Sequence, residues 1–400
     1  MMQLTYRFRL YPSRVQEQKL LATLDQCRWI YNHFLEQLNQ KEGGRTPRRY
    51  ELQATLPKLK HEHPELEQVH SKVLQMVLHR IYSNLRALAE LKRNGRKVGR
   101  LRFKGYGWFK SFTYNQSGFK IIEGHGKRRE LCLSKIGAIP IVLHRELDGK
   151  TKQVHIKRER SGKWFACFSA EVEGAPKIER ATKLIGIDLG IEHYIAGTDG
   201  KFVKHPHNII KSEWKLKREQ RRLSRKQKDS KNRAKQRIRL ARAHERIRNQ
   251  RLDFLHKLSR RYVNSYDFIA VEDLGVKELI EMAHNGKNRA DAAWATFLHM
   301  LTYKAERAGR WVVEVEPRGT TSRCSRCGEA AEKPLWVRVH HCPRCGLELD
   351  RDLNAARNIL QDGLKKIGWE PAEFAPVEIG PLSQLRAGTS SVVETGSPTI

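Results

Sequence analysis

The chain has 400 residues and a strong excess of positive charge, with 77 Lys and Arg against 44 Asp and Glu and a formal net charge of +33. A field of this sign opposes compaction unless a polyanion neutralises it, so we expect a nucleic-acid partner. The absence of an apolar run of about 18 residues and of a lipidation motif argues against a membrane protein. The amino terminus lacks a signal peptide's apolar segment, so we expect a cytoplasmic protein.

The amino-terminal part of the sequence predicts strands interrupted by helices. Residues 4–11 alternate apolar with polar side chains, which is typical of a half-buried strand. A capping box at Ser13–Gln16 starts a helix, and apolar residues recur at helical spacing through residues 13–99. Short strands separated by glycine and charged turns follow. We therefore expect a small antiparallel barrel built from residues 1–12 and 100–180, with a helical domain inserted at 13–99.

The segment at 101–114 interleaves aromatic with basic residues. Alternating aromatic side chains are typical of a barrel core and also of surfaces on which bases stack, and we favour the core. The interleaved Lys and Arg residues nevertheless predict some contact with nucleic acid.

One carboxylate lies within an apolar strand near the middle of the chain. Asp188 belongs to the run Leu184–Gly190, and a second apolar run returns at Tyr194–Gly197. This pattern predicts a buried strand and its hairpin partner. Asp188 is either a surface residue at the hairpin end or a buried carboxylate, which would need a partner or a metal ion.

Two long basic helices are predicted next, over residues 214–228 and 233–263. The first is basic on nearly every face, and the second has one apolar stripe. A charge run usually indicates a solvated face, but cations at this density with few acids favour a groove for a polyanion. The arginines that we select as nucleic-acid contacts are Arg218, Arg221, Arg222 and Arg225.

Two more carboxylates occur in positions that suit a shared site with Asp188. Glu272 ends another apolar strand, and Asp350 and Asp352 stand at the start of a helix. We favour Asp352, because it directly precedes the helix proper and Ala355–Ala356 would allow close packing on a sheet, whereas Asp350 suits a cap. Each acid alone could be an ordinary strand-end or capping residue. Together they would repel one another unless Mg²⁺ bound them, and two such ions can hydrolyse a phosphodiester.

Two Cys-x-x-Cys pairs predict a structural zinc site. Each pair is followed by a glycine, which permits the tight turn that directs two thiolates at one tetrahedral ion. His341 is an alternative ligand, although a surface histidine is the simpler interpretation. The predicted ligands are Cys324, Cys327, Cys342 and Cys345.

Together these motifs resemble the TnpB family of RNA-guided DNA endonucleases, which bacterial insertion sequences encode and which are similar to the ancestors of type V CRISPR effectors. The match extends over residues 4–365, in order and at family-like spacing. It rests on Phe8-Arg9-Leu10-Tyr11-Pro12, Tyr31-Asn32, Ile187-Asp188-Leu189-Gly190, Val271-Glu272-Asp273-Leu274, the two Cys-x-x-Cys-Gly knuckles, and the run from Asp350 to Asn358.

The resemblance implies an α+β multidomain fold. Its parts would be a wedge β-barrel interrupted by a helical recognition domain, and an RNase H-like (RuvC) nuclease with an inserted zinc ribbon. The implied boundaries are 1–12 and 100–180 for the wedge, 13–99 for recognition, 181–318 and 348–366 for the nuclease and 319–347 for the ribbon. Residues 367–400 lie outside the resemblance, and their four Glu, their Pro, Gly, Ser and Thr and their lack of apolar periodicity predict a disordered acidic tail.

The resemblance also implies an activity, its partners, and a nucleoid-associated protein of a bacterium or archaeon. Asp188, Glu272 and Asp352 would be the catalytic residues and the Mg²⁺ ligands, and a guide RNA from the transposon end would direct cleavage of double-stranded DNA beside a short motif that the protein reads. By position, Tyr50, Gln75, Thr113 and Asn115 would read that motif, or they are ordinary surface residues. The short polar loop at 283–290 departs from the family, in which this loop gates access to the site.

The sequence leaves two other functions and one further partner open. A catalytically silent RNA-guided repressor would lose one or more of the acids, whereas this chain keeps all three. An RNA-independent resolvase or transposase would need neither the helical insertion nor so much basic surface. A transposase of the same element is a further expected partner.

Overall fold

The computed structural model describes residues 2–40, 46–124, 129–275, 291–331, 333–334 and 336–369. The predicted loop at 283–290 and nearly all of the predicted tail lie outside these ranges. The chain divides into two compact units, and each is described by itself: residues 1–173 with 223–242 form the first, and residues 174–222 with 243–400 the second. None of the described helices combines the length and the apolarity needed to cross a membrane.

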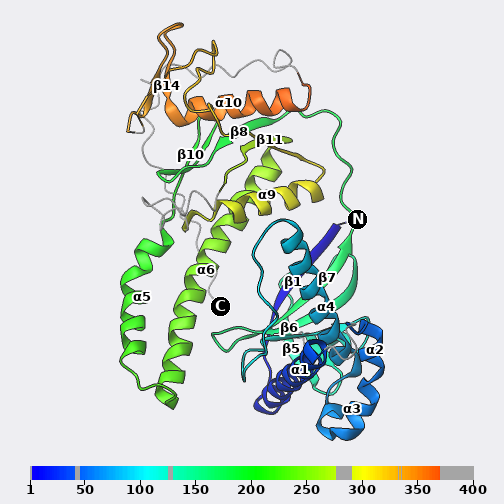
Figure 1. Cartoon of the computed structure of the whole chain (residues 1–400). Helices are drawn as coiled ribbons and strands as arrows, with labels where there is room; N and C mark the ends of the chain where they lie inside the picture. Colours follow the sequence, from blue (N-terminus) through cyan, green and yellow to red (C-terminus); the bar gives the residue numbers. More distant parts are fainter. Residues whose placement is uncertain are drawn as a thin grey trace. The chain divides into compact units, whose positions relative to one another are not determined.

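A seven-stranded antiparallel sheet forms the centre of the first unit (Figure 1). Tyr6, Phe8 and Leu10 of β1 are buried on one face, as the alternation in the sequence predicts. The strand order is β2-β6-β7-β1-β5-β4-β3. The bounds are β1 Met2–Leu10, β2 Ser111–Asn115, β3 Phe119–Glu123, β4 Arg129–Leu133, β5 Gly137–Val142, β6 Lys150–Arg158 and β7 Trp164–Val172.

Helices inserted between β1 and β2 share one hydrophobic core with this sheet. The predicted capping box starts α1: the Ser13 N–H donates to Gln16 Oε1 at 2.9 Å, and the Gln16 N–H donates to Ser13 Oγ at 3.3 Å. Helix α4 packs against α1, α2 and β2. The helices are α1 Arg14–Gln40, α2 Arg49–Ala54, α3 Leu56–Glu62 and α4 Ser71–Arg93, with a 3₁₀ turn, η2, at Pro64–Gln68.

A five-stranded mixed sheet forms the centre of the second unit, in the order β10-β9-β8-β11-β12. Strands β8, β11 and β12 are parallel, whereas β9 runs antiparallel to both of its neighbours. Every residue of β11 is buried, which is typical of a strand covered on both faces. The bounds are β8 Leu184–Asp188, β9 His193–Gly197, β10 Phe202–Lys204, β11 Phe268–Glu272 and β12 Trp311–Val315.

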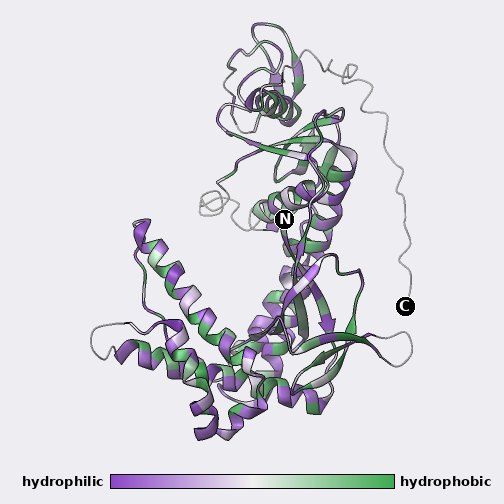
Figure 2. Ribbon diagram, turned by 90° about the vertical axis from the view of Figure 1, so that its right-hand side faces the viewer, coloured by the Kyte–Doolittle hydropathy of each residue, from purple (hydrophilic) through white to green (hydrophobic). Residues whose placement is uncertain are grey.

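Helices cover both faces of this sheet, with α10 on one side and α6 and α9 on the other (Figure 1). Helix α10 lies directly on β8, because a Cβ atom at Gly186 would stand 2.2 Å from the Ala356 carbonyl oxygen. Figure 2 shows the helices banded in hydrophilic and hydrophobic residues, as one buried face requires. The bounds are α5 Asn208–Ser224, α6 Lys231–Ser265, α9 Trp294–Arg307 and α10 Arg351–Lys366, and the segment 223–242, which includes the first part of α6, belongs to the first unit. A small ribbon pairs β13 Val339–His341 with β14 Glu348–Asp350.

Candidate active site and metal centre

Three elements bring the predicted acids to one edge of the mixed sheet. Asp188 ends β8 and Glu272 ends β11. Because these strands are parallel and Val271 is paired with Ile187, the two carboxylates stand next to each other at the carboxyl ends of the strands. Asp352 lies in the first turn of α10, the helix that covers β8.

The carboxyl group of Asp188 lies in an environment that disfavours its charge. The residue is only partly exposed, and the surrounding protein atoms desolvate the carboxyl. This burial, together with the neighbouring charges of Glu272 and Asp352, raises the pKa of Asp188 to about 8, although Arg351 and the Leu189 N–H act in the opposite direction. Such a group favours either a proton or a nearby cation.

Glu272 is buried and held by one hydroxyl group. The Thr320 Oγ1–H donates to Glu272 Oε1 at 2.6 Å. Burial raises the pKa of Glu272, and the hydrogen bond from Thr320 opposes that effect. Thr320 therefore fixes the orientation of the carboxylate and partly compensates for its desolvation.

Asp352 is paired with two arginines that no motif had singled out as site residues. Arg338 Nη2 lies 2.6 Å from Asp352 Oδ2 and 3.1 Å from Glu192 Oε2, and Arg351 Nε lies 3.5 Å from Asp352 Oδ1. Arg338 belongs to the segment between the two cysteine pairs, so that segment contributes directly to the surroundings of Asp352.

Asp350 caps α10 from outside the acid cluster. Its Oδ1 accepts hydrogen bonds from the Asp352 N–H at 2.9 Å and the Leu353 N–H at 3.2 Å. This is the capping role that the sequence offered as the alternative to a catalytic one.

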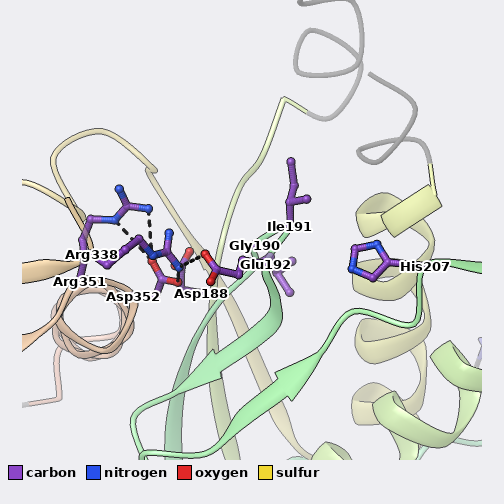
Figure 3. Close-up of a pocket in the computed structure, with 9 residues that line it drawn as sticks. Asp188, Gly190, Ile191, Glu192, His207, Arg338, Arg351 and Asp352 are labelled. Carbon is purple, nitrogen blue, oxygen red and sulfur yellow. Dashed lines mark hydrogen bonds and ion pairs between the residues drawn. The ribbon is translucent and has the colours of Figure 1, made fainter. Parts of the chain in front are cut away.

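A pocket of about 610 Å³ opens beside these groups. Figure 3 shows Asp188, Asp352, Arg338 and Arg351 gathered on one side of it, with His207 on the other. Glu272 is not among its lining residues. Carboxylates next to arginines suit a site that takes both cations and a phosphate group. The lining residues are Asp188, Leu189, Gly190, Ile191, Glu192, His207, Arg338, Arg351 and Asp352.

The four predicted cysteines form a compact cluster. Their sulfur atoms all lie within 4.8 Å of one another, and Cys324 Sγ and Cys345 Sγ are 3.6 Å apart. Among the described residues, this is the one group of three or more Cys, His, Asp or Glu side chains close enough to share a metal ion. The glycine after each pair adopts a positive φ, +77° at Gly328 and +65° at Gly346, and its N–H donates to the backbone carbonyl oxygen of the first cysteine of the pair at 3.0 Å. Four sulfurs so placed suit one tetrahedral zinc ion. His341 is exposed and is not part of the cluster.

The residues expected to read bases all lie in the first unit. Tyr50 is exposed on α2, Gln75 lies on α4, and Thr113 and Asn115 lie on β2. Helix α4 contacts both α2 and β2, so the four belong to adjoining elements. The Thr113 hydroxyl is already within 2.7 Å of His155 Nδ1.

The predicted arginines, three on α5 and Arg225 directly after its end, differ in their environments. Arg222 Nη1 lies 3.1 Å from Glu219 Oε1, and Arg218 stacks over the Trp214 ring at 4.5 Å. Arg221 and Arg225 are exposed. A second hollow of about 230 Å³, between α5 and α6, adds cations that the sequence had not distinguished: Lys211, Lys215 and Arg246.

Three family models match the chain. One described as a probable transposase (OrfB_IS605) covers residues 167–283, a Cas12f1-like TNB domain covers 294–359, and a helix-turn-helix domain covers 1–42. A putative RNA-guided DNA endonuclease of Streptomyces pristinaespiralis is 32% identical over 371 residues, which cover 90% of this chain and 89% of that protein. The chain belongs to the TnpB family. The resemblance found in the sequence motifs is thereby confirmed.

Other comparisons place this TnpB protein beside further endonucleases. The putative RNA-guided DNA endonuclease InsQ of Escherichia coli K12 is 29% identical over 381 residues, covering 90% of this chain and 92% of that protein. The structure of a Cas12f1–sgRNA–target DNA complex aligns with a TM-score of 0.54 over 90% of this chain and 98% of that one. At 14% identity this likeness concerns the fold alone, and it supports the expected mixture of helices and sheets.

Proposed function

We propose that this DNA endonuclease of the TnpB family is guided by RNA and cuts both strands of target DNA at one RuvC-like site. The observation that carries the proposal is the convergence of Asp188, Glu272 and Asp352 at the carboxyl edge of the mixed sheet. The sheet order β10-β9-β8-β11-β12, with β9 antiparallel, supports a ribonuclease-H-like core. We assign residues 181–318 and 348–366 to this core.

The donor set of the site fits magnesium. Carboxylate oxygens are the ligands that Mg²⁺ prefers, and the raised pKa of Asp188 indicates a deficit of positive charge that a bound cation would fill. In our proposal, Asp188, Glu272 and Asp352 would together hold two magnesium ions. Bound magnesium supplies activation of water and stabilisation of the leaving oxygen in phosphodiester hydrolysis.

Residues of the chain itself orient the site. Thr320 holds Glu272, and the Asp350 cap fixes the first turn of α10 and with it Asp352. Arg338 and Arg351 line the pocket and can bind the phosphate of a DNA strand. We assign the zinc ribbon to residues 319–347, where zinc held by the four cysteines would fold the segment that carries Arg338.

The partners follow from charge and from relatives. The relatives from Streptomyces and Escherichia coli are named RNA-guided DNA endonucleases, and the Cas12f1 structure is titled as a complex with guide RNA and target DNA. With a net charge of +33, this chain suits the same partners. We assign the wedge to 1–12 and 100–180 and recognition to 13–99, with Tyr50, Gln75, Thr113 and Asn115 reading the adjacent motif. A partner transposase of the same element remains a further proposal.

A plasmid cleavage assay tests the function. The protein is expressed with the flanking element DNA, so that a specific RNA can co-purify, and the complex is incubated in Mg²⁺ with a plasmid that carries the matching target. We expect linear DNA from the wild type and none from Asp188→Ala with Glu272→Ala, which should still bind the target. An intact plasmid with matched guide and motif would contradict the proposal, and binding without cutting by the wild type would favour the repressor.

A further inference from the structure

The aromatic and basic segment at 101–114, which runs into β2, divides into a buried part and an exposed part. Phe109, Phe112 and Tyr114 are buried in the core of the first unit, as the sequence led us to expect. Tyr106 and Trp108, by contrast, are 85% and 73% exposed. Burial of core aromatics therefore accounts for one part of the alternation and leaves the other part unexplained.

The two exposed rings stand on a turn with defined geometry. The Trp108 N–H donates to the Gly105 carbonyl oxygen at 3.1 Å, and Gly107 has a φ of +70°. Tyr106 thus occupies the second position of a β-turn whose third position needs a glycine. The indole of Trp108 lies close to Gly105, because a Cβ atom there would stand 3.3 Å from Trp108 Cδ1.

Contacts with the rest of the first unit hold the turn on both sides. Before it, the Asn32 side chain of α1 accepts the Lys104 N–H at 2.8 Å and donates to the Lys104 carbonyl oxygen at 3.0 Å. After it, Phe109 packs against Tyr31 with 5.7 Å between ring centroids. Anchored aromatic rings lose little conformational entropy when a flat ligand stacks on them, so their exposure suits binding.

The residues that flank the turn in the sequence are basic and favour an anionic ligand. Between Glu90 and Glu123 the chain has nine Lys and Arg residues and no acidic residue. A basic segment that displays aromatic rings is suited to single-stranded nucleic acid, whose bases stack on the rings while its phosphates meet the cations. The nine cations are Lys92, Arg93, Arg96, Lys97, Arg100, Arg102, Lys104, Lys110 and Lys120.

We propose that Tyr106 and Trp108 form a stacking surface for unpaired bases of a bound nucleic acid. The inference rests on the nucleic-acid partner of the proposed function and adds a contact that is independent of the nuclease site. The strand can belong to RNA or to locally unpaired DNA, because both offer a free base face and a phosphate backbone.

The test measures binding of the full-length protein to three fluorescent probes: a 20-nucleotide RNA, a DNA strand of the same sequence, and a hairpin-capped DNA duplex whose base faces are covered. Tyr106→Ala with Trp108→Ala should weaken binding of one or both single strands by about tenfold to a hundredfold. Binding of the capped duplex should not change. If the variant binds only the RNA probe more weakly, the stacked bases belong to RNA. If it binds only the single-stranded DNA probe more weakly, they belong to unpaired DNA.

Matched variants separate stacking from charge and from misfolding. Tyr106→Phe with Trp108→Phe retains two rings and should bind nearly as well as the wild type. Removing two cations, Lys97→Ala with Arg100→Ala, should reduce the slope of log affinity against log salt, whereas removing the rings should leave that slope unchanged.

Unchanged single-strand affinity in the alanine variant, or an equal loss on the capped duplex, overturns the inference and leaves plasmid cleavage by the wild type unaffected. Conversely, the alanine variant could lose affinity only for single strands while the wild type fails to cut a matched plasmid. That result would contradict the proposed function and support the stacking surface.

Discussion

Arg338 Nη2 lies 2.6 Å from Asp352 Oδ2, so the arginine forms an ion pair with a carboxylate that we propose as a magnesium ligand. A metal ion and the arginine therefore compete for the same oxygen. Replacing Arg338 with alanine removes the competitor and restores the repulsion among the three acids, and both changes favour the cation. We expect the free protein to bind Mn²⁺ about threefold to tenfold more tightly, as measured by the paramagnetic signal of the unbound ion.

Glu192→Gln is the matched control for this measurement. Glu192 contacts the same guanidinium at 3.1 Å, but its removal leaves the pair between Arg338 and Asp352 in place. The control should not tighten Mn²⁺ binding. Equal or weaker Mn²⁺ binding by Arg338→Ala would show that the arginine does not oppose the metal.

The raised pKa of Asp188 predicts how stability depends on pH when magnesium is absent. The Asp188 carboxyl of the folded protein keeps its proton up to about pH 8, whereas that of the unfolded chain releases it near the ordinary pKa of 3.8. The resulting stabilisation is complete at low pH and is lost as the pH rises through 8, by at most about 1.4 kcal/mol per pH unit. In EDTA, the wild type should lose stability between pH 5 and 8.

Asp188→Asn isolates this effect from the titration of other groups. Urea unfolding at several pH values should give a smaller pH dependence for the variant than for the wild type. Magnesium should also flatten the profile of the wild type. Superimposable profiles for the two proteins in EDTA would mean that Asp188 ionises normally.

The cysteine cluster predicts that zinc is needed for cleavage because it folds the ribbon that carries Arg338, although it takes no part in the reaction itself. Cys342→Ser should abolish binding of one zinc ion per chain and unfold the ribbon that carries Arg338. Zinc content measured by atomic absorption should fall to zero, and DNA cleavage should fall with it. Cys132→Ser, which lies on β4 outside the cluster, should keep both zinc and activity. Wild-type cleavage by a zinc-free variant would show that the nuclease site does not need the zinc-bound ribbon.

The hydrogen bond from Thr320 to Glu272 predicts that its loss slows DNA cleavage. Thr320→Val retains the shape of the side chain but removes the 2.6 Å hydrogen bond to a buried carboxylate, which costs about 1–3 kcal/mol. We expect cleavage to slow about tenfold and to need more magnesium. Thr320→Ser keeps the hydroxyl and should remain close to the wild type. Wild-type rates and magnesium dependence in Thr320→Val would show that the bond does not orient Glu272.

The parts of the site that could be predicted are those with local patterns. Cys-x-x-Cys-Gly knuckles and carboxylates at the ends of apolar strands are visible in a few residues, and parallel strands necessarily bring their carboxyl ends to one edge. Asp350 and Asp352 could be ranked only by position, and the hydrogen bonds of the cap distinguish their roles.

The remaining parts depend on contacts between distant segments. Arg338 and Thr320 are 14 and 48 residues along the chain from the acids that they contact. The division of the aromatic segment was equally hidden, because burial of Phe109 and exposure of Trp108 depend on α1 and on one turn. A pattern of residue types gives no information about such pairings.

Strand-resolved cleavage kinetics test whether one site built from Asp188, Glu272 and Asp352 cuts both DNA strands. A matched target labelled differently on each strand is incubated with guide-loaded wild type or with guide-loaded Asp188→Ala, and target binding is measured in parallel. We expect the wild type to cut both strands in sequence and the variant to bind the target but cut neither. Continued cutting of either strand by Asp188→Ala at the wild-type rate would contradict it.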